Sequence, residues 1–218
     1  NLSFVVKDYL SMKGHTVHHF DRGDEALAAF SKEDYDICLL DVMLPNIDGF
    51  TITKTIRNKN RQIPIIFISA KIQIEDKLEG LSIGGDDYIF KPFSIEELLL
   101  KVNIFLKRKK TIEELDEKQK LFDFGIFHLD IENLVLIAES EEIRLTQREA
   151  DLLAFFIQNK NRLCRREEIL VALWGQDDYF LGRSLDVFIS RIRKYLQIDE
   201  NIMIENVPRV GFRMVIKE

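Results

Sequence analysis

The seven residues 39–45, LLDVMLP, place an aspartate, Asp41, where an apolar run ends and a turn begins. In open parallel sheets, the groups beyond the carboxyl ends of the strands meet in a crevice, and such folds bind their ligands there. Two later apolar runs, IIFI and YIF, lead in the same way into Ser69 and Lys91. Each run therefore ends in a residue that can contact a phosphoryl group.

The first half of the chain alternates short strand-like runs with segments of helical period. We expect strands over 17–20, 37–40, 65–68 and 88–90, and helices over 23–30, 49–57, 74–83 and 95–106. This alternation is typical of a parallel sheet covered by helices. The chain opens directly on a helical pattern at residues 2–10, so the first strand of such a fold is missing.

The second half shows a different sequence pattern, because its strand-like runs are too closely spaced to be linked by helices. Strands are expected over 122–124, 126–131, 134–138 and 142–145, and a closing hairpin over 203–207 and 212–216. Thr146 and Glu149 stand at the spacing of a capping box, which indicates that a helix begins there. Two further helices are expected over 166–173 and 184–196. This pattern predicts a small antiparallel sheet, three helices and a wing.

A run of four basic residues, 107–110, is followed by mixed charges up to residue 120. Such a run usually marks the end of a helix and the start of a solvated linker, although a nucleic-acid patch is the alternative. We therefore predict a first domain over 1–107, a linker over 108–120 and a second domain over 121–218.

Bulk composition argues against a strongly basic protein. The 218 residues include 31 basic and 37 acidic side chains, a formal net charge of −6, so any nucleic-acid signal must be local. No run approaches the roughly 18 apolar residues of a membrane span. We expect a cytoplasmic protein that does not contact a membrane. Its two cysteines are too few for a disulfide framework or a metal cluster.

Asp41, Ser69 and Lys91, in this order, resemble the receiver domain of bacterial response regulators. The second half resembles the winged-helix output domain of the OmpR/PhoB family through Leu145-Thr146 with Glu149, Leu173-Trp174-Gly175 and the segment 183–194, RSLDVFISRIRK. The resemblance implies an α/β, flavodoxin-like parallel-sheet receiver without its first strand, followed by a winged helix-turn-helix domain of the α+β class.

The resemblance also implies a site chemistry. A histidine kinase would transfer a phosphoryl group to Asp41, and Lys91 would pair with the phosphoryl oxygens. Ser69 and the adjacent Ala70 would contact the same oxygens, and Tyr88 would act with Ser69 as a conformational switch. The peptide bond between Lys91 and Pro92 would be cis, as in the family.

Magnesium is the cofactor that the resemblance implies, with Asp41 and the backbone carbonyl of Met43 as ligands. Receiver domains of this family also carry an acidic pair after the first strand, and no such pair precedes the first helix here; Asp8 lies inside that helix. Either the chain lacks a preceding strand or the metal site has been lost, and we favour the former because losing a central strand exposes sheet edges. The chain as written should bind magnesium poorly.

Homodimerisation on activation is implied through the fourth helix, the last strand and the last helix of the receiver. That face would carry the charged residues Lys77, Asp86, Asp87, Glu97 and Lys101 around an apolar patch of Leu78, Leu81 and Leu99. The alternative is a set of solvated charges on two amphipathic helices. Ion pairs between such charges each contribute little free energy.

Promoter double-stranded DNA is the implied partner of the second domain. The apolar residues of the helix 184–196 would face the core, and its polar residues would enter the major groove. Contact positions by resemblance are Arg183, Ser190, Arg191 and Arg193, with Arg209 at the wing directed to a minor groove. Trp174 would lie in a loop-forming segment that touches the DNA backbone or RNA polymerase. A basic stripe that contacts proteins is the alternative.

The expected function is therefore a two-component response regulator, not an enzyme. A haloacid-dehalogenase-type hydrolase needs a second aspartate where Met43 stands, so that alternative is poor. A transcription regulator that binds DNA independently of phosphorylation is the stronger rival, and a signalling adaptor that does not bind DNA is the third.

Overall fold

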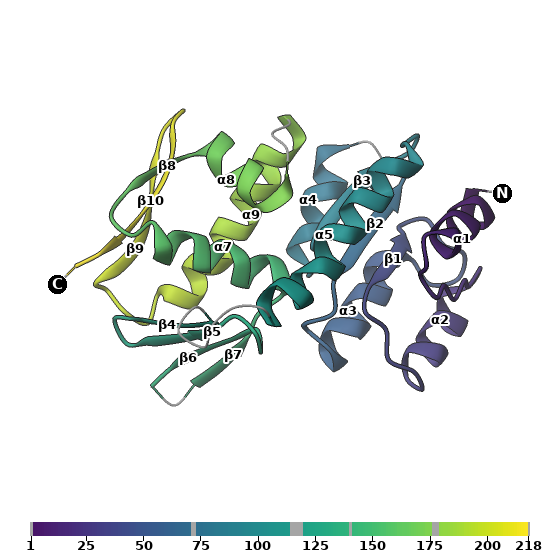
Figure 1. Cartoon of the computed structure of the whole chain (residues 1–218), viewed down its shortest axis with the longest axis horizontal. Coiled ribbons are helices and arrows are strands. Elements are labelled where there is room, and N and C mark those ends of the chain that lie inside the picture. Colours follow the sequence, from purple (N-terminus) through teal and green to yellow (C-terminus); the bar gives the residue numbers. More distant parts are fainter. Residues whose placement is uncertain (1, 71–72, 114–119, 140, 176–178, 218) are drawn as a thin grey trace. The chain divides into compact units, whose positions relative to one another are not determined.

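The computed structural model describes residues 2–70, 73–113, 120–139, 141–175 and 179–217. The chain divides into two compact units, Asn1–Leu106 and Lys107–Glu218, and each is described by itself. Figure 1 labels the elements of both.

The first unit is built on a parallel sheet of three strands in the order β1-β2-β3. These are β1 (Cys38–Asp41), β2 (Ile65–Ser69) and β3 (Asp87–Phe90). The helices are α1 (Leu2–Met12), α2 (Gly23–Phe30), α3 (Gly49–Lys59), α4 (Ile74–Ser82) and α5 (Ile95–Glu113). Every residue of β2 is buried, as a continuous apolar run at the centre of a parallel sheet requires. The predicted α/β parallel sheet is confirmed.

Helices cover both faces of this sheet, which gives three layers (Figure 1). On one face Phe67 packs with Phe50 and Ile52 of α3, and α2 adds Leu27 to this cluster. On the other face Ile66 and Ile68 pack with Leu98 and Val102 of α5, and α1 adds Val6.

The strand predicted over 17–20 is absent, and this prediction was wrong. In a flavodoxin-like sheet the strand order is 2-1-3-4-5, so the second strand pairs only with the first. Among the described residues β1 has a single neighbour, β2. Residues 17–20 therefore have no partner strand with which to form a ladder.

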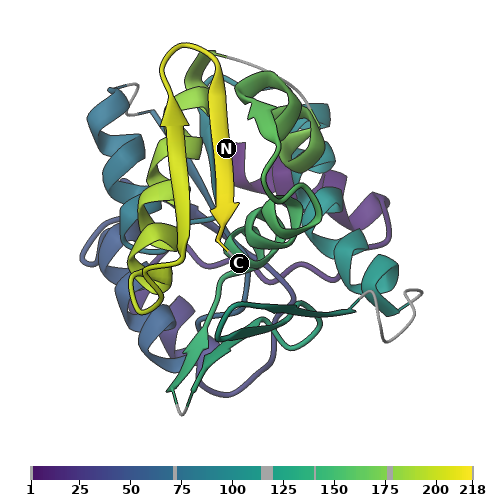
Figure 2. The same cartoon turned by 90° about the vertical axis from the view of Figure 1, so that its left-hand side faces the viewer.

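The described residues of the second unit include two antiparallel sheets and three helices. The strands β4 (Leu121–Phe124), β5 (Phe127–Asp130), β6 (Val135–Ala138) and β7 (Glu141–Arg144) form a four-stranded meander. The helices are α7 (Gln147–Gln158), α8 (Arg166–Trp174) and α9 (Tyr179–Leu196). The second sheet has the order β8-β10-β9, from Leu163–Arg165, Gly211–Ile216 and Ile202–Val207. Figure 2 shows β9 and β10 as the yellow hairpin of the predicted wing.

Helix boundaries differ most from the sequence prediction in two places. Helix α9 begins at Tyr179, before the expected start at residue 184. Helix α5 continues to Glu113, so helical structure covers the first part of the segment expected to be a linker, and residues 114–119 of that segment lie outside the described residues. The apolar side of α9 is as expected, because Leu185, Phe188 and Ile192 are fully buried.

Side-chain caps fix the start of two helices. Thr146 and Glu149 form the predicted capping box at α7. At α3, Asp48 accepts hydrogen bonds from the Thr51 backbone N–H and hydroxyl, both at 2.9 Å. The backbone N–H of Thr51 is the main reason that the pKa of Asp48 lies below its ordinary value of 3.8.

The Asp48→Ala variant should lower the free energy of unfolding by about 1 kcal/mol at neutral pH, because α3 loses its N-cap. A carboxyl group with a depressed pKa stabilises the fold above its ordinary pKa and loses that contribution as the pH falls through the folded value. The difference in the free energy of unfolding between the variant and the unsubstituted chain should therefore become smaller below about pH 4. Urea denaturation followed by circular dichroism measures it. The exposed Asp34→Ala variant is the control, and a difference that is constant with pH would contradict the cap.

Candidate functional sites

The parallel register brings the three predicted site residues to one edge of the sheet. Asp41 is the last residue of β1, Ser69 is the last residue of β2, and Lys91 directly follows β3. Lys91 Nζ lies 2.5 Å from Asp41 Oδ2. Both side chains are about one third exposed, 28% for Lys91 and 30% for Asp41, so the carboxylate is paired and accessible.

Hydrogen bonds to backbone groups and a cis peptide bond define the chain around this pair. The other oxygen of Asp41 accepts a hydrogen bond from the Met43 N–H at 2.9 Å. The Lys91 N–H donates to the Ser69 carbonyl at 2.7 Å, and the peptide bond from Lys91 to Pro92 is cis, as predicted. Ser69 is fully buried, whereas Ala70 is exposed.

Gly49 also shapes the site, and the sequence analysis did not identify it. A Cβ atom at this position would lie 2.4 Å from the Asp41 carbonyl oxygen, which no real Cβ atom tolerates. The Gly49 N–H donates to the Val42 carbonyl at 3.1 Å. Helix α3 can therefore begin directly against the loop that carries Asp41 only because residue 49 is glycine. The Asp-Gly pair that opens the helix was the available signal.

Tyr88, the predicted switch residue, lies inside the first unit. It is 3% exposed, and its ring centroid is 5.9 Å from that of Phe67 and 5.0 Å from that of Phe90. The side chain thus already occupies an inward position between Phe67 and Phe90.

The residues present do not fit a magnesium ion by themselves. Among the described residues, no group of three histidine, cysteine, aspartate or glutamate side chains could hold a metal. Asp41 contributes a single carboxylate, whose two oxygens contact Met43 and Lys91. Magnesium takes six oxygen ligands, usually with one or two carboxylates and several waters. Asp41 and the Met43 carbonyl therefore supply only part of the predicted site.

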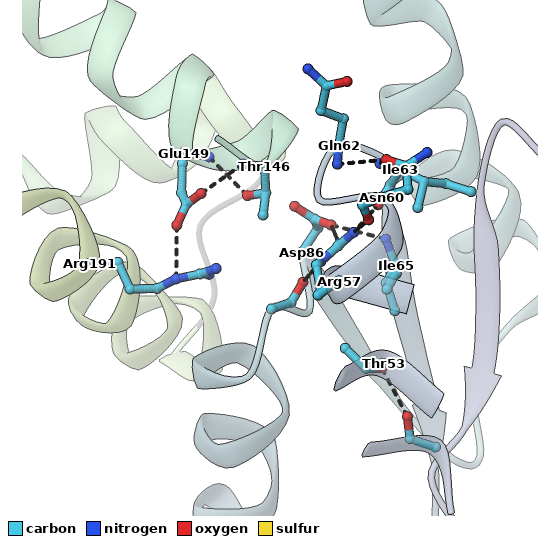
Figure 3. Close-up of polar contacts among 12 residues, drawn as sticks. Thr53, Arg57, Asn60, Gln62, Ile63, Ile65, Asp86, Thr146, Glu149 and Arg191 are labelled. Atoms are coloured by element: carbon cyan, nitrogen blue, oxygen red, sulfur yellow. Dashed lines mark hydrogen bonds and ion pairs between the residues drawn. The ribbon is translucent and has the colours of Figure 1, made fainter. Parts of the chain in front are cut away.

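Several residues predicted for a dimer surface are buried within the chain, which corrects their expected exposure. Asp86 is fully buried and accepts hydrogen bonds from Arg57 at 2.8 Å and from the Ile65 N–H at 3.0 Å (Figure 3). Arg57 also donates to the carbonyls of Gly84 and Ile63. A buried carboxylate needs such partners, because an isolated charge in the interior is very costly.

The other predicted dimer residues divide into two groups. Lys101 and Asp87 pair with each other at 2.8 Å, and both side chains are buried. Lys77 and Leu81 are also buried, at 3% and 1% exposure, with Lys77 Nζ lying 5.6 Å from the centroid of the Phe90 ring. Leu78, Glu97 and Leu99 are half-buried and leave part of their surface accessible.

Some of the predicted DNA-contact residues are exposed, and others form contacts within the chain. Arg183 and Ser190 on α9 are exposed, and Arg209 is exposed at the tip of the wing with a positive φ of 65°. Arg193 is exposed as a residue, but its Nε and Nη2 donate to the Ile204 carbonyl at 3.0 and 2.6 Å. Arg193 therefore ties α9 to strand β9.

Arg191 does not face outward, which corrects the prediction. Its side chain is 13% exposed, and its Nε lies 2.9 Å from Glu149 Oε1 (Figure 3). Glu149 also accepts hydrogen bonds from the Tyr195 hydroxyl at 2.8 Å and the Thr146 N–H at 2.7 Å. The capping-box carboxylate is fully buried, so it draws the guanidinium inward and joins the start of α7 to α9.

Trp174 is likewise buried rather than presented to DNA or RNA polymerase. It is 3% exposed, and its ring lies 5.8 Å from that of Phe188 and 4.5 Å from the Arg148 guanidinium. Gly175 ends the helix directly after it in the left-handed conformation that glycine favours. The tryptophan is thus a core residue at the end of α8.

A unit with a strand-end aspartate paired to a lysine, followed by a winged-helix unit, defines a response regulator. Family models agree: residues 2–103 match the response regulator receiver domain, and residues 140–214 match the C-terminal domain of transcriptional regulatory proteins. The chain belongs to the OmpR/PhoB family of response regulators.

Individual relatives extend over nearly the whole chain. The transcriptional regulatory protein RprY of Bacteroides fragilis is 37% identical over 218 residues, which is 100% of this chain and 92% of that protein. The response regulator ArlR of Staphylococcus saprophyticus is 35% identical over 97% of this chain and 93% of its own. A solved structure of a RitR mutant, 23% identical, covers 100% of this chain and 95% of its own with a TM-score of 0.75, a likeness of fold alone. No helix in the described ranges has the length and apolar character to cross a membrane.

The Glu149→Ala variant should lower the free energy of unfolding by about 3 kcal/mol, because Arg191 and the α7 cap lose a shared buried partner. Fluorescence of Trp174, the single tryptophan, reports this transition during urea denaturation. The matched control is Glu142→Ala, which removes an exposed pair with Arg144 and should cost less than about 0.5 kcal/mol. Equal effects of the two substitutions would contradict the role of Glu149.

Proposed function

We propose that Asp41 accepts a phosphoryl group from the phosphohistidine of a partner kinase, and that this modification controls binding to promoter DNA. The observation that carries the proposal is the pair of Asp41 and Lys91 at 2.5 Å, partly accessible at the strand ends. An Asp41 oxygen would form a bond to phosphorus as the phosphorus–nitrogen bond breaks, and the imidazole would leave with a proton from solvent. Lys91 would offset charge on the phosphoryl oxygens.

The added group changes the charge at this edge of the sheet. A phosphoryl group carries about −1.5 to −2 charges and additional acceptor oxygens, so Lys91 would turn from the carboxylate toward the phosphoryl oxygens. Ser69 ends the neighbouring strand β2, and Tyr88 on β3 pairs in register with Phe67, two residues before Ser69. We propose that these two residues carry the change into the first unit.

Homodimerisation would follow from this change, and the accessible parts of Leu78, Glu97 and Leu99 on α4 and α5 support an interface there. Two copies on one promoter would align two α9 helices with successive major grooves. The wing would reach the adjacent backbone or minor groove through Arg209.

A second candidate function is a regulator that binds DNA without phosphorylation. The observation that favours it is the incomplete set of carboxylates for magnesium among the described residues. In this alternative the Asp41–Lys91 pair is a permanent ion pair, and only the second unit carries the function.

Incubation with acetyl phosphate and a large excess of magnesium, which offsets the incomplete metal site of this chain, should add the mass of one phosphoryl group, and the Asp41→Asn variant should not gain it. The matched control is Asp48→Asn, which alters a nearby aspartate that caps a helix and should still be modified. Intact-protein mass spectrometry is the measurement. Equal modification of the Asp41→Asn variant would refute Asp41 as the acceptor, and no modification of the unsubstituted chain would favour the second candidate.

The Arg209→Ala variant should bind a random-sequence DNA duplex more weakly, because the wing loses one phosphate contact or minor-groove contact. The slope of log affinity against log salt should fall in magnitude by about 1. Fluorescence anisotropy over a salt series gives this slope. Arg144→Ala, which removes an exposed arginine from the four-stranded sheet, is the control and should leave the slope unchanged.

A further inference from the structure

Strand β9 is at the end of the sheet order β8-β10-β9, so within the described residues it has one neighbouring strand, β10. In an antiparallel ladder the backbone groups of successive residues point to opposite sides of the strand. The Met214 carbonyl accepts a hydrogen bond from the Asn161 N–H, on the β8 side of β10, and Ile204 is the residue opposite Met214 on β9. The Ile204 carbonyl therefore points away from β10, to the free edge of the wing.

The side chain of Arg193 on α9 contacts this edge. Its Nε and Nη2 both donate to the Ile204 carbonyl, at 3.0 and 2.6 Å. The acceptor is an uncharged backbone group, so no opposite charge holds the guanidinium in place. A guanidinium presents its N–H groups in a fixed planar arrangement, whereas the ammonium of lysine is a point charge on a flexible stem. The contact thus depends on the shape of the arginine side chain rather than on its charge.

We propose that Arg193 is a positioning residue for DNA binding, which fixes the wing relative to α9 and does not itself contact a base or a phosphate. This role rests on the proposed binding of promoter DNA and names a further residue on which that binding depends. It replaces the direct contact that the family resemblance implied for Arg193.

The tie to β9 starts from the side of α9 that is directed to DNA. Arg183 and Ser190 are about two helical turns apart, and Arg193 follows Ser190 at the i, i+3 spacing of surface neighbours. All three residues are exposed. The orientation of the wing is therefore set from the same surface that would enter the major groove.

The tie also lies near the base of the wing. Ile204 is in the middle of β9, whereas Arg209 stands at the tip with a positive φ of 65°. At about 3.3 Å per residue, the stretch from Ile204 to the end of β9 at Val207 spans about 10 Å. A small rotation of the hairpin at its base thus displaces Arg209 by a larger distance. Holding Ile204 against α9 sets the span between the major-groove residues and the wing tip.

The alternative role for Arg193 is a direct phosphate contact. Such a contact requires a positive charge, which lysine also supplies, whereas the tie to Ile204 requires the planar guanidinium. The substitution Arg193→Lys therefore separates the two roles, because it keeps the charge and removes the tie.

The test is a double-variant cycle on the full chain with a random-sequence DNA duplex, measured by fluorescence anisotropy over a salt series. Arg193→Lys and Arg209→Ala should each weaken binding by about fivefold. The double variant should also bind about fivefold more weakly, rather than about 25-fold, because the Arg209 contact is already lost when the wing is not held. For the same reason Arg193→Lys should lower the salt slope by about 1, although it conserves the charge.

The matched control is Arg144→Lys, which makes the same chemical change at an exposed arginine of the four-stranded sheet. It should leave the affinity and the salt slope unchanged, alone or combined with Arg209→Ala. Circular dichroism checks that every variant is folded.

A second measurement tests the tie without DNA. The Arg193 Nε–H should exchange with solvent at least about tenfold more slowly than the Arg209 Nε–H, because the first donates to Ile204 and the second belongs to an exposed residue. Nuclear magnetic resonance of the free protein follows both groups. Equally rapid exchange of the two would show that the tie does not persist in solution and would overturn the proposal.

Two results with DNA would overturn the positioning role alone. One is full affinity and an unchanged salt slope in Arg193→Lys, as a direct phosphate contact predicts. The other is a loss that adds to that of Arg209→Ala, so that the double variant binds about 25-fold more weakly. If the unsubstituted chain binds no duplex at low salt, the proposed DNA binding is itself refuted and the positioning role with it, which distinguishes this failure from the other two.

Discussion

The site depends on one constraint, that three parallel strands end at the same edge of the sheet. This register places Asp41, Ser69 and Lys91 on neighbouring strand ends although they are far apart in the sequence. The ion pair that results is about one third exposed, and such pairs contribute at most about 1 kcal/mol. An interaction of that size holds Lys91 at the site but can be exchanged for a phosphoryl group. The geometry is therefore suited to a reversible contact.

The buried ion pairs of this chain, in contrast to the exposed Asp41–Lys91 pair, are not suited to exchange. Asp86 with Arg57 in the first unit and Glu149 with Arg191 in the second each join a helix to a distant segment. Each carboxylate also accepts a backbone hydrogen bond. In Glu149 the Thr146 N–H donates to the oxygen that does not contact Arg191, and in Asp86 the Ile65 N–H donates to the same oxygen that pairs with Arg57. Removing one partner lowers the free energy of unfolding by more than the intact pair contributes, because the other charge stays buried without a counter-ion. These contacts therefore fix how the elements pack against one another.

The sequence predicted features that depend on local spacing. The capping box at Thr146 and Glu149, the buried residues of α9 and the strand-end positions of Asp41 and Lys91 all follow from short patterns. The strand over 17–20 did not form because pairing requires a neighbour that no local pattern supplies. The orientations of Arg191 and Asp86 were missed because a buried counter-ion from another helix outweighed the preference of a charged residue for solvent. Gly49 was missed because its close approach to Asp41 is a tertiary contact.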